Sequence, residues 1–302
     1  MSPGLSPSDP ARRVPSLPGT GLGALRLLSV SHGNASMDGF ERAALDPARV
    51  SDLSLRLERR GIDAVVLSTC NRVELYWHSH GEDDDREAEE AFRAAVGAGG
   101  GPGMVLRASG EQVASHLLRV ACGLDSLLLG EAEILGQVRE ALEAAAEDGF
   151  VAGVFRAAAR CGGCARAETS IGAGALSVAS AAVQLLARMG APLPGLGVLV
   201  VGIGETGLKA ARHLRAEGVG RLVILNRTRE RAEAAAGSLQ AEPGPLGALP
   251  ARLAEVDAVI VAVHAPAFLL AAADARVAMA ARGGRPLVLL DVSMPRAVDP
   301  AV

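Results

Sequence analysis

Short apolar runs alternate with amphipathic stretches along the first part of the chain. Leu25 to Val30, Ala64 to Leu67 and Val73 to Trp77 are apolar and bounded by polar or turn residues, which predicts strands. An acidic run opens a stretch of helical spacing from Glu82 to about Val96. The alternation predicts a mixed α/β domain over residues 24–165.

From Ser109 onward the pattern becomes helical. Ser109 followed by Gln112 is typical of a capping box, and an apolar stripe follows at Val113, Leu117, Val120 and Leu124. His116 lies on the edge of this stripe. A histidine in such a place is more often a structural residue than a catalyst.

A second helix is expected from Glu131 to Arg139. Glu133 and Gln137 are four residues apart and therefore share one face, whereas the apolar residues point to another. The helix could present a carboxylate and an amide to a cleft, or it could be an ordinary amphipathic helix with a solvated polar face.

The second part of the chain has a strand, a glycine-rich turn and a helix in succession. Val198 to Val201 reads as a buried parallel strand, and a helix is expected from Leu208 to Ala216. The turn between them has the G-x-G-x-x-G spacing of a dinucleotide site, in which the helix N-terminus faces the pyrophosphate. Its residues are Gly202, Ile203, Gly204, Glu205, Thr206 and Gly207.

Further parallel strands are expected at Arg221 to Leu225, Val256 to Val263 and Leu287 to Asp291. Together with a long connecting helix from about Leu176 to Met189, they predict a doubly wound Rossmann domain within residues 166–302. The alternative is a structural Rossmann unit that binds no nucleotide.

The residues after the second Rossmann strand indicate which cofactor the domain prefers. An acidic residue there would accept a hydrogen bond from the ribose 2′-hydroxyl of NAD, but the sequence reads Asn226, Arg227 and Thr228. An arginine can pair with a 2′-phosphate. The sequence therefore favours NADPH.

Composition excludes several classes of protein. The chain has 302 residues, 49% of them hydrophobic, and a net charge of −4, so no global basic field attracts nucleic acid. Residues 1–23 are rich in Pro, Ser and Gly and are expected to be a disordered tail rather than a signal peptide. The longest apolar stretch contains charged residues and a proline, so no membrane span is expected. A cytoplasmic protein is the natural interpretation.

The four cysteines do not form the pattern of a disulfide framework. Cys161 and Cys164 have Cys-x-x-Cys spacing, but no second pair follows at a zinc-site distance, and the context is not that of a thioredoxin-like unit. We therefore expect this pair to lie in a helix or a bend and to bind no metal.

Cys70 is the candidate nucleophile. It follows a predicted strand and stands two residues before Arg72, and a nearby guanidinium would lower the thiol pKa toward neutrality. The alternative is a small buried hydrophobic residue, which is what most free cysteines are.

Several blocks, in the same order, resemble the glutamyl-tRNA reductase family from about Leu25 to the end of the chain. The blocks are Ser68 to Tyr76, His116 to Ser126, Gly130 to Val138, Glu168-Thr169 with Ala175 to Ala182, and Asp291 to Arg296.

The resemblance implies an NADPH-dependent reduction of glutamyl-tRNA(Glu) to glutamate-1-semialdehyde, the first step of the five-carbon route to 5-aminolevulinate and porphyrins. Cys70 would hold glutamate as a thioester, Arg72 would clamp a carboxylate, and His116 would act on the leaving oxygen or on thiol ionisation. Carried over by match, the residues of the glutamate pocket are Thr69, Asn71, Arg72, Ser126, Glu131, Ala132, Glu133 and Gln137. The implied partners are charged tRNA-Glu and the downstream semialdehyde aminotransferase.

The chain also departs from the family pattern. Gly33, Gly163 and Cys164 stand where the family usually has basic residues, which would weaken tRNA binding, and Glu133 replaces a glutamine. The family is homodimeric, and its C-terminal dimerisation helices are absent after Pro300, so a monomer or a weak dimer is expected from a divergent or C-terminally short member.

Two other interpretations remain open. The Rossmann half also looks similar to shikimate dehydrogenases, although their catalytic lysine and aspartate have no counterpart in the first domain, and that chemistry would leave Cys70 unexplained. The other is a degenerate homologue that binds nucleotide or tRNA and regulates tetrapyrrole synthesis.

Overall fold

The computed structural model describes residues 21–97, 101, 103–131, 133–172, 177–189, 192–265 and 267–302. The chain divides into two compact units, residues 1–175 and 176–302. The boundary expected at 165/166 falls inside a continuous helix, Phe150–Glu168.

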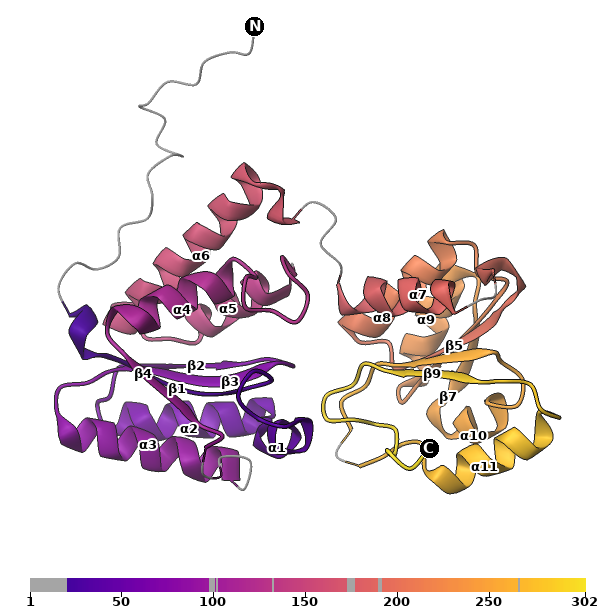
Figure 1. Cartoon of the computed structure of the whole chain (residues 1–302), viewed down its shortest axis with the longest axis horizontal. Coiled ribbons are helices and arrows are strands. Elements are labelled where there is room, and N and C mark those ends of the chain that lie inside the picture. The colour runs from indigo at the N-terminus through magenta and orange to yellow at the C-terminus, as the bar shows by residue number, and fades with distance from the viewer. Residues whose placement is uncertain are drawn as a thin grey trace, which may run out of the picture. The chain divides into compact units, whose positions relative to one another are not determined.

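The first unit is built on an antiparallel sheet with the strand order β2-β3-β1-β4. Its strands are β1 (Leu25–Ser31), β2 (Ala64–Ser68), β3 (Arg72–His78) and β4 (Leu106–Ser109). Its helices are α1 (Met37–Ala43), α2 (Pro47–Arg59), α3 (Glu82–Val96), α4 (Glu111–Ala121), α5 (Glu133–Glu143) and α6 (Phe150–Glu168). Helices α4, α5 and α6 lie on one face of the sheet, and α1, α2 and α3 lie on the other (Figure 1).

The face under α4, α5 and α6 carries an apolar core. Leu27 of β1 and Tyr76 of β3 pack there against Leu117 of α4, Val138 of α5 and Phe155 of α6. The Tyr76 and Phe155 rings meet edge to face with centroids 5.1 Å apart. Because β3 is the second strand of the sheet and is covered on both faces, its side chains are buried from Arg72 to Trp77.

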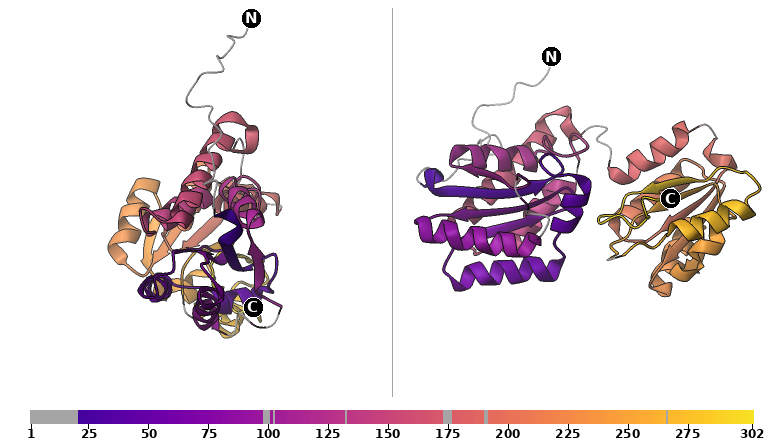
Figure 2. Two further views of the ribbon diagram at one scale, coloured as in Figure 1. Left: turned by 90° about the vertical axis from the view of Figure 1, so that its left-hand side faces the viewer. Right: turned by 60° about the horizontal axis from the view of Figure 1, so that its bottom comes forward.

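The second unit is a parallel sheet of five strands in the order β7-β6-β5-β8-β9. The strands are β5 (Gly197–Val201), β6 (Arg221–Asn226), β7 (Glu242–Pro245), β8 (Ala258–Val261) and β9 (Val288–Asp291). The helices are α7 (Val178–Arg188), α8 (Glu205–Ala216), α9 (Arg229–Leu239), α10 (Leu249–Arg252) and α11 (Ala272–Ala281). Helices α7, α8 and α9 cover one face and α10 and α11 cover the other, and Figure 2 shows the same layering. This is the doubly wound architecture that the sequence predicts.

Helix α7 corresponds to the helix expected from about Leu176 to Met189, and one of its faces packs on the second unit. Ala179, Ala182, Val183 and Leu186 are buried in the core of the second unit. The opposite face leaves Leu185 50% and Met189 56% exposed. The expected first residue, Leu176, lies outside the described residues.

Three local expectations of the first unit are wrong. Ser109 does not cap α4, because it is the last residue of β4 and pairs with Arg26 of β1, so that Gly110 is the N-cap without a side-chain bond. Leu124 lies beyond the end of α4 and is exposed. A 3₁₀ helix, Leu22–Ala24, includes the last two residues of the expected disordered tail, whereas residues 1–20 lie outside the described part.

None of the helices within the described ranges is both long and apolar enough to span a membrane.

Candidate active site

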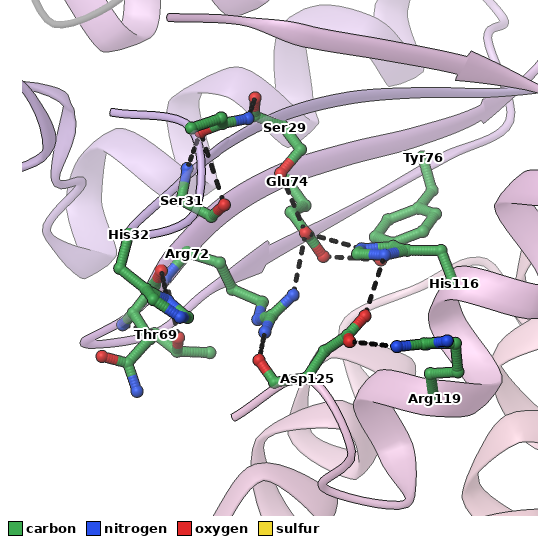
Figure 3. Close-up of polar contacts among 12 residues, drawn as sticks. Ser29, Ser31, His32, Thr69, Arg72, Glu74, Tyr76, His116, Arg119 and Asp125 are labelled. Carbon is green, nitrogen blue, oxygen red and sulfur yellow. Dashed lines mark hydrogen bonds and ion pairs between the residues drawn. The ribbon is translucent and has the colours of Figure 1, made fainter. Parts of the chain in front are cut away.

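Cys70 lies in the tight turn that joins β2 to β3. The backbone N–H of Thr69 donates to the carbonyl of Arg72 (2.8 Å), and the Thr69 hydroxyl accepts from the backbone N–H groups of Asn71 (3.0 Å) and Arg72 (3.2 Å). The backbone N–H of His32 donates to the Asn71 carbonyl at 3.2 Å (Figure 3). These bonds fix the turn, and the Cys70 side chain is half-buried within it.

The electrostatic surroundings of Cys70 are the reverse of those expected from the sequence. Burial, followed by the negative charges of Glu131 and Glu133, raises the pKa of the thiol to about 11. Arg72 does lower the pKa, but it is the weakest of these influences. The expectation of a thiol activated by Arg72 in the resting protein is therefore wrong, because two carboxylates distant in sequence and the loss of water outweigh one guanidinium.

Arg72 is held inside the protein and not at the surface of a pocket. Its Nη1 donates to Glu74 Oε1 at 3.1 Å, and its Nη2 donates to the backbone carbonyl of Asp125 at 2.5 Å. The side chain is 3% exposed. The resemblance implied that Arg72 binds a carboxylate of the substrate. Both of its terminal nitrogens instead donate to groups of the protein.

Glu74 is the centre of a buried polar network on the α4 side of the sheet (Figure 3). Its Oε1 accepts from Ser29 Oγ (3.0 Å) and Arg72 Nη1 (3.1 Å) and contacts His116 Nε2 (2.8 Å), while its Oε2 accepts from Tyr76 OH (2.6 Å). Burial opposes the ionisation of Glu74, but the His116 hydrogen bond and the Arg72 charge outweigh it and lower the pKa to about 2. Glu74 is therefore a carboxylate in the folded protein. Burial, followed by the negative charge of Glu74, raises the pKa of the Tyr76 hydroxyl.

His116 reaches this network from α4. Its Nε2 faces Glu74, and its Nδ1 lies 3.5 Å from Asp125 Oδ2, so the imidazole stands between two carboxylates. Asp125 also accepts from Arg119 Nη2 at 2.9 Å. The His116 side chain is 23% exposed, and it lines a surface hollow of about 400 Å³ together with Gln112 and Arg119. His116 is therefore both held by hydrogen bonds and accessible.

Sequence reasoning missed Glu74, Ser29, Tyr76 and Asp125. A signal was present, because Arg72, Glu74 and Tyr76 occupy alternate positions of one strand and must share a face. Ser29 lies directly opposite Glu74 in the β1–β3 register, which only the strand pairing reveals.

The remaining predicted pocket residues are spread over three elements. Asn71 is buried in the turn, Ser126 is half-buried beside Asp125, and Glu131 is 3% exposed just before α5. Glu133 and Gln137 are half-buried on α5, and both Glu131 and Glu133 influence the Cys70 thiol. Ala132 lies outside the described residues.

The loop from Gly123 to Gly130 carries Asp125 and Ser126 and is closed at its base. The N–H of Gly130 donates to the carbonyl of Gly123 at 2.9 Å, and both glycines have positive φ (76° and 77°). A Cβ at Gly130 would lie 2.0 Å from the carbonyl oxygen of Ile171, so no other residue fits there. Arg166 of α6 donates to the carbonyls of Gly130 and Glu131.

In the second unit, the predicted dinucleotide turn has the expected conformation. Gly202 has φ 90°, and a Cβ there would lie 2.3 Å from the Ala262 carbonyl oxygen; a Cβ at Gly207 would lie 2.1 Å from the Gly202 oxygen. Gly204 is the N-cap of α8, and a Cβ there would meet nothing within 4 Å. Two glycines are thus required by packing, and the third leaves open space for the close approach of a phosphate. Ile203 lies between them, and Glu205 and Thr206 begin α8.

Asn226 ends β6 and ties this turn to the following one. Its Oδ1 accepts from the N–H of Ile203 (3.3 Å), and its Nδ2 donates to the carbonyl of Thr228 (2.9 Å). Arg227 is exposed between them. The site therefore presents a cation beside the glycine turn and has no acidic residue at the end of β6, a combination that fits a 2′-phosphate.

Cys161 and Cys164 both lie in α6, in agreement with the helix expected there. The Sγ atoms of Cys161 and the buried Cys122 are 3.9 Å apart. Within the described ranges, no group of three or more His, Cys, Asp or Glu side chains is arranged to hold a metal ion.

Comparison with known proteins covers both units. Residues 28–169 match the family described as glutamyl-tRNAGlu reductase, N-terminal domain, and residues 184–302 match shikimate / quinate 5-dehydrogenase. The chain is 40% identical to glutamyl-tRNA reductase of Thermus thermophilus, over 92% of this chain and 68% of the relative. Glutamyl-tRNA reductase of Shewanella oneidensis is 36% identical over 92% of this chain and 68% of its own length.

Among solved structures, the chain is similar to glutamyl-tRNA reductase from Methanopyrus kandleri, with 34% identity, a TM-score of 0.50 and coverage of 93% of this chain and 69% of that one.

The chain belongs to the glutamyl-tRNA reductase family. Members of this family are NADPH-dependent oxidoreductases of tetrapyrrole biosynthesis. The likeness to shikimate dehydrogenases is confined to the nucleotide-binding unit, whereas the glutamyl-tRNA reductase relatives match both units. The relatives therefore account for the Cys70 turn as well as for the Rossmann domain.

Proposed function

We propose that this chain reduces glutamyl-tRNA(Glu) to glutamate-1-semialdehyde with NADPH, through a thioester on Cys70. The observation that carries the proposal is a cysteine held in a hydrogen-bonded turn at the start of β3, the strand that carries Glu74 of the Glu74–His116–Asp125 network, within a chain of the glutamyl-tRNA reductase family.

The first chemical step is acyl transfer. The sulfur of Cys70 attacks the ester carbonyl, the bond from that carbon to the tRNA 3′ oxygen breaks, and the thiol proton passes to the departing oxygen. Because the thiol is protonated at rest, with a pKa of about 11, this step needs a proton acceptor or a change in the local charge.

Two features of the site meet that need. The free ammonium of the glutamyl group is a cation, and its binding near Glu131 and Glu133 would offset the charges that raise the pKa of the thiol. Glu74 holds His116 at Nε2 (2.8 Å), whereas Nδ1 makes only a longer contact of 3.5 Å with Asp125 Oδ2, so we assign to Nδ1 the proton transfer to the leaving oxygen.

The second step converts the thioester to the aldehyde and frees the Cys70 thiolate, which takes up a proton. NADPH supplies the hydride when it is bound. The residues proposed to hold it are Gly202 to Gly207 at the pyrophosphate and Asn226, Arg227 and Thr228 at the adenosine 2′-phosphate.

Thr69, Asn71, Ser126 and Gln137 are proposed to line the glutamate pocket, with Glu131 and Glu133 facing its ammonium. Arg72 is assigned a positioning role instead of direct binding, because its guanidinium holds Glu74 and the Asp125 carbonyl in place.

The test is conversion of charged tRNA-Glu to semialdehyde by the purified chain with NADPH. Cys70→Ser should abolish the product and leave NADPH binding unchanged, and Cys164→Ser on α6 is the matched control that should remain active. A glutamyl adduct on Cys70, detected by mass spectrometry when NADPH is omitted, would support the thioester. If the unchanged chain binds NADPH and tRNA but forms no semialdehyde, the regulatory alternative is correct instead.

A further inference from the structure

His264 stands at an exposed position on the carboxyl edge of the parallel sheet. It follows β8 by three residues and is exposed to solvent. In the strand order β7-β6-β5-β8-β9, the chain moves outward from β5 to β7 and then returns to the other side of β5 at β8. The gap between the ends of β5 and β8 is therefore the topological switch point, where open α/β sheets bind their ligands.

The residues before His264 pack against the glycine turn. A Cβ at Gly202 would lie 2.3 Å from the Ala262 carbonyl oxygen and 2.6 Å from Val263 Cγ1. The segment after β8 and the proposed pyrophosphate turn after β5 are thus in direct contact. Asn226 contacts the same turn from the opposite side, at the end of β6.

This arrangement orders the two halves of a dinucleotide. The pyrophosphate joins the halves, so if the adenosine 2′-phosphate lies at Arg227 beyond β6 and the pyrophosphate lies at the glycine turn beyond β5, the other nucleoside extends over the end of β8. That end is where His264 stands. This step rests on the proposed function, since it takes the adenosine half to be bound at Arg227.

The imidazole of His264 is held in a defined state. Its Nδ1 lies 3.1 Å from the carbonyl oxygen of Met294, and because a carbonyl only accepts, Nδ1 carries the proton. In the neutral ring, Nε2 is then a hydrogen-bond acceptor, and it has no partner among the described residues.

The loop that orients the ring is itself anchored. Ser293 Oγ accepts from the N–H of Val263 at 3.1 Å, which ties the segments after β8 and β9 together. Asp291 accepts backbone N–H bonds from Ser293 (3.0 Å), Ala297 (2.8 Å) and Val298 (2.9 Å). A side chain oriented by such supporting bonds presents its free atom at little further entropic cost.

We propose that His264 binds the nicotinamide riboside half of NADPH, with Nε2 accepting a hydrogen bond from a hydroxyl or the carboxamide of that half. The ribose hydroxyls carry O–H donors, and the carboxamide carries N–H donors. His264 is therefore a cofactor-positioning residue on the opposite side of the glycine turn from Arg227.

The test compares two ligands by calorimetry: NADPH, and adenosine 2′,5′-bisphosphate, which carries the adenosine 2′-phosphate but no nicotinamide. His264→Ala and His264→Phe should each raise the Kd for NADPH about three- to tenfold, as expected for one lost hydrogen bond between neutral groups, and should leave the Kd for the bisphosphate unchanged. Arg227→Ala should weaken both ligands. His213→Ala, at an exposed position on α8, is the matched control and should change neither.

Equal weakening of both ligands by the His264 variants would show a structural effect on the domain and overturn the assignment, as would no change for NADPH. A different outcome is that the unchanged chain binds the bisphosphate and yet shows no preference for NADPH over NADH. In that outcome, the assignment and the proposed cofactor both fail. If it prefers NADPH and His264→Ala binds NADPH normally, the assignment alone fails.

Discussion

The protonation state of Cys70 is the property in which the structure differs most from the sequence expectation, and it can be measured directly. With a pKa of about 11, only about one thiol in 1,000 is ionised at pH 8. An ordinary cysteine with a pKa of about 8.5 is about one-quarter ionised at that pH. Since the thiolate is the reacting form, alkylation of Cys70 in the free protein should be about two orders of magnitude slower than that of a simple thiol.

The assay is the rate of iodoacetamide labelling of the Cys70 peptide, followed by mass spectrometry at several pH values, with N-acetylcysteine as the reference thiol. Partial burial slows labelling at every pH, but it does not move the pH at which the rate levels off. The Cys70 rate should therefore rise about tenfold per pH unit between pH 7 and 10, without a plateau.

Two substitutions test the cause. The single variants Glu133→Gln and Glu131→Gln should each raise the labelling rate at pH 8 about three- to tenfold, because each removes a negative charge that disfavours the thiolate. Glu140→Gln, at an exposed position on the same helix α5, should leave the rate unchanged. A rate that levels off near pH 8.5 in the unchanged protein would refute the reasoning, and so would equal effects of all three variants.

Two further predictions concern the buried network and the cofactor. Glu74→Gln should lower the free energy of unfolding by about 3–5 kcal/mol in urea titrations, because it leaves the buried Arg72 guanidinium without its counter-charge. The folded pKa of Glu74, about 2, is below its ordinary value of 4.5, so the carboxylate contributes on the order of 3 kcal/mol that is present above about pH 4.5 and is lost as the pH falls toward 2. Unfolding free energies measured between pH 7 and 3 should fall in the unchanged protein and fall less in the variant; equal slopes would contradict this. Arg227→Ala should raise the Kd for NADPH about ten- to a hundredfold and that for NADH little, with Arg231→Ala on α9 as the control, and equal binding of NADPH and NADH by the unchanged protein would refute the preference.

The nucleotide-binding unit could be predicted from the sequence because its signals are local. A buried strand, the turn from Gly202 to Gly207 and the helix that follows are adjacent in the chain. The close contact that requires Gly207 lies within this motif, whereas the one that requires Gly202 is with Ala262 after β8. The same holds for the strands β1 to β3, whose apolar runs end where the structure ends them within a residue or two.

Local patterns failed where a distant segment competes. Ser109 has the sequence of a helix cap, but its pairing with Arg26 across the sheet keeps it in β4. A pattern of four residues carries no information about a strand partner 83 positions away. Ser109 therefore pairs through its backbone in the sheet and does not cap the helix.

The chemistry of the site was decided by the tertiary structure alone. The sequence identified Cys70 and Arg72 as neighbours and assigned the guanidinium to the thiol. Folding instead directs Arg72 toward Glu74 and Asp125, and it brings Glu131 and Glu133 close enough to Cys70 to disfavour its ionisation. The residue types therefore follow from the sequence, whereas pKa values depend on burial and on charges that meet only through long-range contacts, because water is excluded and the effect of each charge grows where the dielectric is low.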